Sequence, residues 1–64
     1  MTDAGEIVKM CRQRLKWSRH HLGKKAGVAM STIINIENNM DCRLSTFEKL
    51  IEAMGYEIEI LRKE

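Results

Sequence analysis

The thiol and imidazole side chains of this 64-residue sequence, the groups that most often bind transition metals, are two cysteines and two histidines. Cys11 and Cys42 lie far apart, and neither has a second cysteine or a histidine at the close spacing that metal sites use. His20 and His21 are adjacent, so on a helix their rings would diverge by about 100°. We therefore expect no metal and no cofactor, and two free thiols in a reducing cytoplasm.

Catalytic motifs are also missing from the sequence. It contains no Ser-His-Asp set, no paired carboxylates in a plausible cleft and no phosphate-binding loop. A chain of this length forms one domain, residues 1–64, near the lower limit for folding alone. No apolar run approaches the roughly 20 residues that span a bilayer. We expect a binding domain that is neither an enzyme nor associated with a membrane.

Basic residues are concentrated in one part of the chain. Residues 7–36 contain seven lysines and arginines and no acidic residue, whereas the other 34 residues carry four basic and nine acidic residues. The net charge of +2 conceals this asymmetry. A basic face on so small a domain indicates a polyanionic partner, with a merely solvated helical face as the alternative.

Two short helices joined by a tight turn are predicted within and just beyond this basic region, at residues 18–38. Ser18 is a good N-cap for a helix over 19–26, and Gly27 can end that helix in the left-handed conformation that other residues adopt only at a cost. A second helix follows over 30–38. Such a pair crosses closely and projects its second helix outward, at a width that fits the major groove of DNA.

Two further helices and a strand flank this unit. Apolar residues at helical spacing predict a helix over 5–16. Ser45 and Glu48 form the S-x-x-E pattern of a capping box, which predicts a helix over 46–54. Residues 56–61 change to an alternation of period two, which predicts a half-buried β-strand.

These elements resemble the helix-turn-helix domains of the phage-repressor and Cro-like family, often called the XRE family. The resemblance covers the chain from Val8 to Gly55. The residues that carry it are Arg12, Ala26-Gly27-Val28, Ser31-Thr32-Ile33, Ile36-Glu37-Asn38 and Ala53-Met54-Gly55. The resemblance implies an all-α, compact, lambda-repressor-like domain of four to five helices, here with a short C-terminal β-strand, that binds double-stranded DNA.

The resemblance also implies which side chains meet DNA. Outward positions of the second motif helix read bases in the family, and here they are Met30, Ser31, Ile34 and Asn35. Asn35 could donate to and accept from one adenine, while Met30 and Ile34 could contact a thymine methyl group. The residues placed to contact phosphates are Ser18, Arg19, Lys24, Thr32, Asn38, Arg43, Ser45 and Thr46.

The family also pairs an arginine of the first helix with a glutamate of the recognition helix. This implies a partly buried ion pair between Arg12 and Glu37. Four positions depart from the family pattern: Arg19 in place of Gln, Gly23 in place of Ala, Ala29 in place of Ser or Thr, and Asn39 in place of Gly.

The sequence favours a sequence-specific transcriptional regulator, a small repressor that binds a palindromic operator as a homodimer. We expect the dimer contact at residues 56–61, because an unpaired strand needs a partner and a second copy offers the same strand. The helix over 46–54 is the alternative interface, as in many phage repressors. The tail also looks like that of the antitoxin branch, so a second hypothesis is an antitoxin that binds DNA and a toxin protein. A pure protein-interaction domain is the third, and the charge asymmetry disfavours it.

Overall fold

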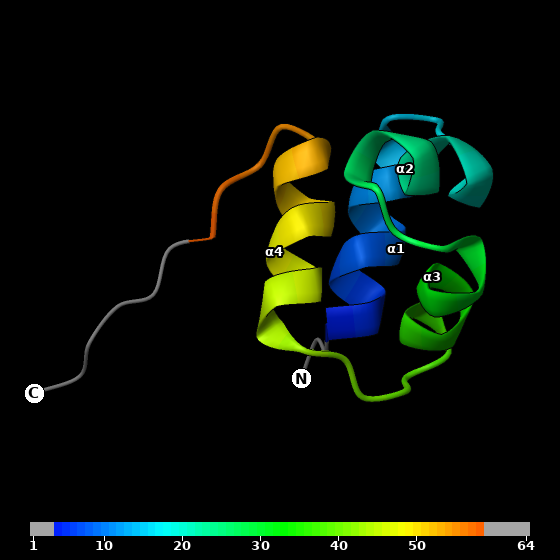
Figure 1. Ribbon diagram of the computed structural model, residues 1–64. Helices are drawn as coiled ribbons and strands as arrows, with labels where there is room; N and C mark the ends of the chain where they lie inside the picture. Colours follow the sequence, from blue (N-terminus) through cyan, green and yellow to red (C-terminus); the bar gives the residue numbers. More distant parts are fainter. Residues whose placement is uncertain (1–3, 59–64) are drawn as a thin grey trace, which may run out of the picture.

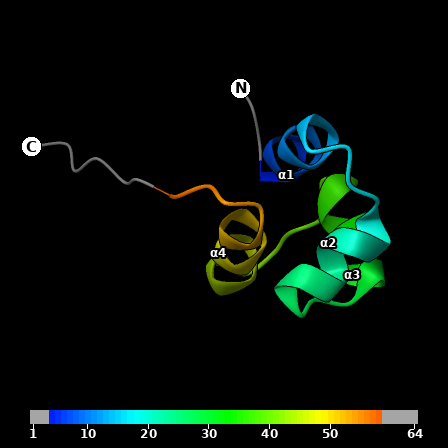
Figure 2. The same ribbon diagram turned by 90° about the horizontal axis from the view of Figure 1, so that it is seen from above.

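Four helices form the domain in the computed structural model, which describes residues 4–58 (Figure 1). They are α1 (Ala4–Arg14), α2 (Arg19–Ala26), α3 (Met30–Glu37) and α4 (Leu44–Ala53). Helices α1 and α4 lie side by side, and the α2–α3 pair packs against both; Figure 2 shows the arrangement from above. The predicted all-α helix-turn-helix architecture is confirmed, with every helix within two residues of its predicted bounds.

The turn between α2 and α3 is built as the sequence predicts. Ser18 has an extended backbone, and its Oγ accepts a hydrogen bond from the His21 N–H at 3.0 Å, so Ser18 caps α2. Gly27 ends α2 with φ of 70°, and its N–H donates to the Gly23 carbonyl oxygen at 2.9 Å. Ala29 precedes α3 and offers no side-chain cap. The start of α3 therefore depends on tertiary packing for its stability.

Two glycines allow close backbone approaches near the ends of α3. A Cβ at Gly23 would lie 2.7 Å from the Val28 carbonyl oxygen, so the alanine usual in the family would force a backbone shift here. A Cβ at Gly5 would overlap the carbonyl oxygen of Ile36. Helix α1 thus approaches the end of α3, and α2 approaches the turn before α3, at contacts that admit no side chain. These two approaches fix the position of α3 on the domain.

The hydrophobic core draws on all four helices. Its buried side chains are Val8 and Cys11 from α1, Leu22 from α2, Ile33 and Ile36 from α3, and Leu50, Ile51 and Met54 from α4 and its end. Both cysteines are free thiols, Cys11 buried and Cys42 half-buried. No helix within residues 4–58 is long and apolar enough to cross a lipid bilayer. Because the core occupies one face of α3, the opposite face is left open to solvent.

The start of α4 differs from the prediction. The helix begins at Leu44, and its N-cap is Arg43, whose side chain makes no capping hydrogen bond. Ser45 therefore lies inside the first turn, and the capping box expected from Ser45 and Glu48 is wrong. The S-x-x-E pattern marks a cap only where its serine has a non-helical backbone, and here the helix has already begun at Leu44.

The strand predicted over 56–61 is not seen in the described part of the chain. Residues 56–58 have no regular secondary structure, and 59–61 lie outside the described residues. The Tyr56 N–H donates to a carbonyl oxygen in the last turn of α4 at 3.1 Å. The side chain of Ile58 packs, half-buried, against the core. The first residues after α4 thus pack on their own domain.

Lys16 carries backbone strain. Its φ of 59° lies in the left-handed region, which costs a residue with a side chain about 1–2 kcal/mol. We expect Lys16→Gly to raise the free energy of unfolding by up to about 1 kcal/mol, because the added freedom of glycine in the unfolded chain offsets part of the relief. Lys9→Gly, at an exposed position inside α1, is the matched control and should lose about 0.7 kcal/mol. Urea denaturation compares the two; equal destabilisation would contradict the strain.

Candidate nucleic-acid interface

The outward face of α3 is open to solvent. Met30 is 47% exposed, and Ser31 and Asn35 are exposed as well. Ile34, expected to be exposed beside them, is half-buried, because it lies only about 100° round the helix from the core residue Ile33. Three of the four residues predicted to read bases therefore lie on an accessible face, and the fourth presents part of its side chain.

A hollow of about 290 Å³ lies between α3 and the start of α4. Four predicted contact residues line it, Thr32 and Asn35 from α3 and Arg43 and Thr46 from the beginning of α4. Arg43 and Asn35 are exposed, while the two threonines are half-buried. Hydroxyl, amide and guanidinium groups around one hollow are the donors that protein–DNA interfaces direct at phosphates and base edges.

A smaller hollow of about 210 Å³ lies where α2 meets the first residues of α3. Lys24 and Met30 line it together with His20 and Gly23. The structure thus brings a predicted phosphate contact, Lys24, next to a predicted base contact, Met30.

The other predicted phosphate contacts lie at helix ends outside these hollows. Ser18 is exposed, and although its Oγ accepts from His21, its hydroxyl hydrogen can still be donated. Asn38 is exposed at the C-terminal end of α3, and Ser45 is exposed in the first turn of α4. All three side chains are accessible from solvent.

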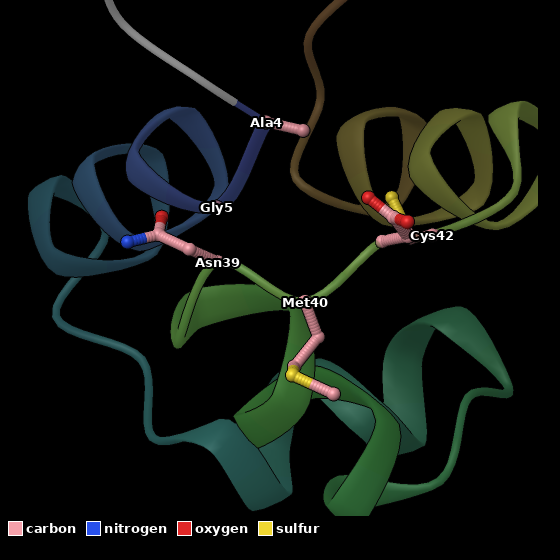
Figure 3. A pocket seen from close by; sticks show the side chains of 6 residues that line it. Ala4, Gly5, Asn39, Met40 and Cys42 are labelled. Atoms are coloured by element: carbon pink, nitrogen blue, oxygen red, sulfur yellow. The ribbon is translucent and has the colours of Figure 1, made fainter.

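A third hollow, of about 260 Å³, contains none of the predicted contact residues (Figure 3). Ala4 and Gly5 of α1 line it together with Asn39, Met40 and Cys42 of the α3–α4 loop, and Asn39 lies next to Gly5. Among residues 4–58, no group of three or more His, Cys, Asp or Glu side chains is arranged to hold a metal ion.

A buried carboxylate joins α3 to α1 and α2. Arg12 donates from Nε to Oε2 of Glu37 at 2.8 Å and from Nη2 to Oε1 at 3.0 Å, a bidentate geometry. Its Nη1 donates to the Trp17 carbonyl oxygen at 2.9 Å. Arg19 adds a bond from Nε to Oε1 of Glu37 at 3.1 Å. The Glu37 side chain is 1% exposed, against 11% for Arg12 and 42% for Arg19. The ion pair expected between Arg12 and Glu37 is confirmed.

The charge state of Glu37 follows from these contacts. Burial raises the pKa of the carboxyl group, but the hydrogen bonds and positive charges of Arg12 and Arg19 outweigh that effect. The pKa of Glu37 is therefore lowered from its ordinary value of 4.5. The carboxylate is charged at neutral pH, and its charge stabilises the folded state.

The bond between Arg19 and Glu37 is a feature that the sequence analysis missed. The two residues lie on different helices, and the sequence assigned Arg19 only to a phosphate. One signal points to it: Glu37 is the first acidic residue after Glu6, and seven basic residues stand between them. A buried acid in such surroundings is expected to meet more than one cation.

Because the pKa of Glu37 is lowered, the folded state holds a proton on it less readily than the unfolded state. The stabilisation is fully present above the ordinary pKa of about 4.5 and is lost as the pH falls through the lower folded value. We expect Glu37→Gln to lower the free energy of unfolding at pH 7 by about 3 kcal/mol, since Arg12 keeps a buried charge. Denaturation from pH 7 to pH 3 should then show a weaker pH dependence than the wild type.

Glu52→Gln is the control for this prediction, because Glu52 is an exposed glutamate on α4. It should leave the stability at pH 7 nearly unchanged. If Glu37→Gln and Glu52→Gln lose stability equally, the Glu37 carboxylate does not hold the helices together.

Comparisons with known proteins agree with this geometry. A profile of the helix-turn-helix family matches residues 8–61. Antitoxin HipB of Escherichia coli strain K12 is 37% identical over 54 residues, which are 83% of this chain and 61% of that protein. Antitoxin HipB of Escherichia coli O6:H1 is 37% identical over 54 residues, 57% of its length. The chain thus spans about three fifths of the length of these curated relatives. The chain belongs to the XRE-type helix-turn-helix family, whose members are DNA-binding domains and not enzymes.

Proposed function

We propose that the chain is a sequence-specific transcriptional repressor that binds a palindromic operator as a homodimer and places α3 in the major groove. The observation that carries the proposal is the open face of α3, where Met30, Ser31 and Asn35 are exposed between the cationic side chains of Lys24 and Arg43. A regulator of this kind acts on the chromosome, so the expected cytoplasmic location belongs to the same proposal.

Affinity and sequence selectivity come from different residues in this proposal. Helix α3 contains no lysine or arginine, so it supplies little attraction for phosphates. That attraction falls to the exposed cations of α2 and the start of α4, among them Arg19, Lys24 and Arg43. Asn35 then reads an adenine, and Met30 with the accessible part of Ile34 contacts a thymine methyl group.

Binding to the DNA upstream of the chain's own gene tests this division. If a dimer neutralises about six phosphates, log K should fall against log salt with a slope near −5. Asn35→Ala should weaken binding by about 1–3 kcal/mol at a single operator position, whereas Lys24→Ala should weaken all duplexes alike. Gel-shift titrations at several salt concentrations measure both effects.

Gln13→Ala is the control for Asn35→Ala, because Gln13 is an exposed amide side chain on α1 that lines neither hollow beside α3. It should bind every duplex as the wild type does. A salt-independent affinity, or an equal effect of the two amide substitutions, would contradict the proposed interface.

The homodimer is proposed to form through residues 56–61. The support is the period-two pattern, which leaves a row of backbone groups that need a partner strand, and the two-fold symmetry that would set two α3 helices about 34 Å apart. Helix α4 is the alternative interface: Leu44 at its start is 58% exposed. Both interfaces would join two copies, but only the first depends on the tail.

A chain ending after Ile58 separates the two interfaces. It keeps every residue that the structure describes, including the Ile58 side chain on the core, and removes half of the predicted strand. We expect it to sediment as a monomer and to lose most of its operator affinity, because two half-sites would no longer be bound together. A shortened chain that remains a dimer with unchanged affinity would assign the contact to α4 instead.

An antitoxin is the second candidate function. The similarity to Antitoxin HipB favours it, at 37% identity over most of this chain. The proposed partner is then a toxin protein encoded beside this chain's gene. Size-exclusion chromatography of the two purified proteins distinguishes the candidates, since a stable complex supports the antitoxin and separate elution supports the repressor alone.

A further inference from the structure

The ion pair between Arg19 and Glu37 has no counterpart in the resemblance, since the family commonly has Gln where this chain has Arg19. We propose that Glu37 is a positioning residue for DNA binding: its buried carboxylate holds the Nε of Arg19 so that both Nη groups are presented together to a DNA phosphate. This inference rests on the DNA-binding function proposed above and deepens it.

The guanidinium of Arg19 has enough N–H donors to bind Glu37 and a phosphate at the same time. A guanidinium carries one N–H on Nε and four on its two Nη nitrogens. The Nε of Arg19 donates to Oε1 of Glu37 at 3.1 Å, and within residues 4–58 its Nη groups donate to no protein atom. Because the Nε bond restrains the plane of the guanidinium, the four remaining N–H groups form a fork of defined direction. A phosphate is best bound by such a fork.

The charges around Glu37 favour an anion at the same place. Two guanidinium groups share one carboxylate, so the three side chains together carry one excess positive charge. The Glu37 side chain is 1% exposed and Arg12 11%, whereas Arg19 is 42% exposed. The excess charge therefore reaches solvent at Arg19, and the carboxylate is too deeply buried and too well neutralised to repel a phosphate strongly.

The contact between Arg19 and Glu37 also connects the start of α2 to the end of α3. Arg19 is the first residue of α2, directly after the cap Ser18, so its side chain lies at the positive end of that helix. Glu37 is the last residue of α3. The carboxylate thus connects a phosphate contact on α2 to the end of the recognition helix, and holding Arg19 in advance reduces the side-chain ordering that binding requires.

A charge-conserving substitution tests the proposal in the full chain. Lysine at position 19 keeps the charge but has one nitrogen, which cannot bind Glu37 and present a fork as well. We expect Arg19→Lys to weaken operator binding about fivefold with an unchanged salt slope, and Arg19→Ala to weaken it about tenfold with a slope reduced by about 0.9 per subunit. Lys9→Arg is the control, the reverse exchange at an exposed position of α1 to which no DNA contact is assigned, and it should bind as the wild type.

Stability and NMR separate positioning from folding. Arg19 is well exposed, so Arg19→Lys should leave thermal unfolding unchanged, and its weaker binding is then not a folding defect. In the wild type, the Arg19 Nε–H signal should be protected from exchange both free and on the operator duplex. Glu37→Gln, studied at a temperature where it is folded, should lose that protection.

Three results would overturn the proposal. If Arg19→Lys binds the operator with wild-type affinity, Arg19 contributes only its positive charge, and its orientation by Glu37 does not matter for binding. Loss of the protected Nε–H signal on DNA binding would show that Glu37 competes with the phosphate for Arg19. If the wild-type chain binds no duplex even at low salt, the DNA-binding function fails together with this inference, whereas the first two results leave that function standing.

Discussion

The carboxylate of Glu37 is the constraint on which the arrangement of the domain depends. The Glu37 side chain is 1% exposed, so its charge must be paired within the protein. An unpaired buried charge would remove a large part of the small free energy of unfolding of a 64-residue domain. Arg12 meets this demand from α1, and the same guanidinium reaches the Trp17 carbonyl oxygen before α2. One ion pair therefore determines where α1, the connection to α2 and the end of α3 lie relative to one another.

Close backbone packing, in addition to the ion pair, sets the position of α3 on the domain. The core is small, so the position of α3 is set by direct approaches at Gly5 and Gly23, where any side chain would meet a carbonyl oxygen. Helix α3 itself has eight residues and no side-chain cap at Ala29. Such a helix is not stable alone, so packing against the rest of the domain must both stabilise it and set its direction. Its outward face is then free to vary without cost to the core.

The sequence predicts best those features that local chemistry decides. Helix α2 has its predicted bounds because a capping serine and a left-handed glycine delimit it, Ser18 and Gly27. The predicted start of α4 is too late, because the serine of the S-x-x-E pattern lies inside the helix and not at its cap. The bond from Arg19 to Glu37 depends on how the helices cross, which spacing along the chain does not encode. The predicted contacts with DNA remain predictions, although the structure gathers several of them around α3.

The basic residues lie on the elements next to α3 and not on α3 itself, and this arrangement affects how the domain could distinguish DNA sequences. A recognition helix without lysine or arginine gains little from contact with the wrong sequence, so discrimination rests on the hydrogen bonds and apolar contacts of its exposed face. The cations proposed to attract DNA lie on neighbouring elements, where they would also hold the domain on any duplex. Binding of the correct sequence then requires that phosphate contacts and base contacts be in register. In the proposed arrangement Glu37 provides that register, because it belongs to α3 and holds the cation at the start of α2. A surface arginine without a hydrogen bond to α3 would attract DNA equally well, but it would leave the angle of α3 in the groove less defined.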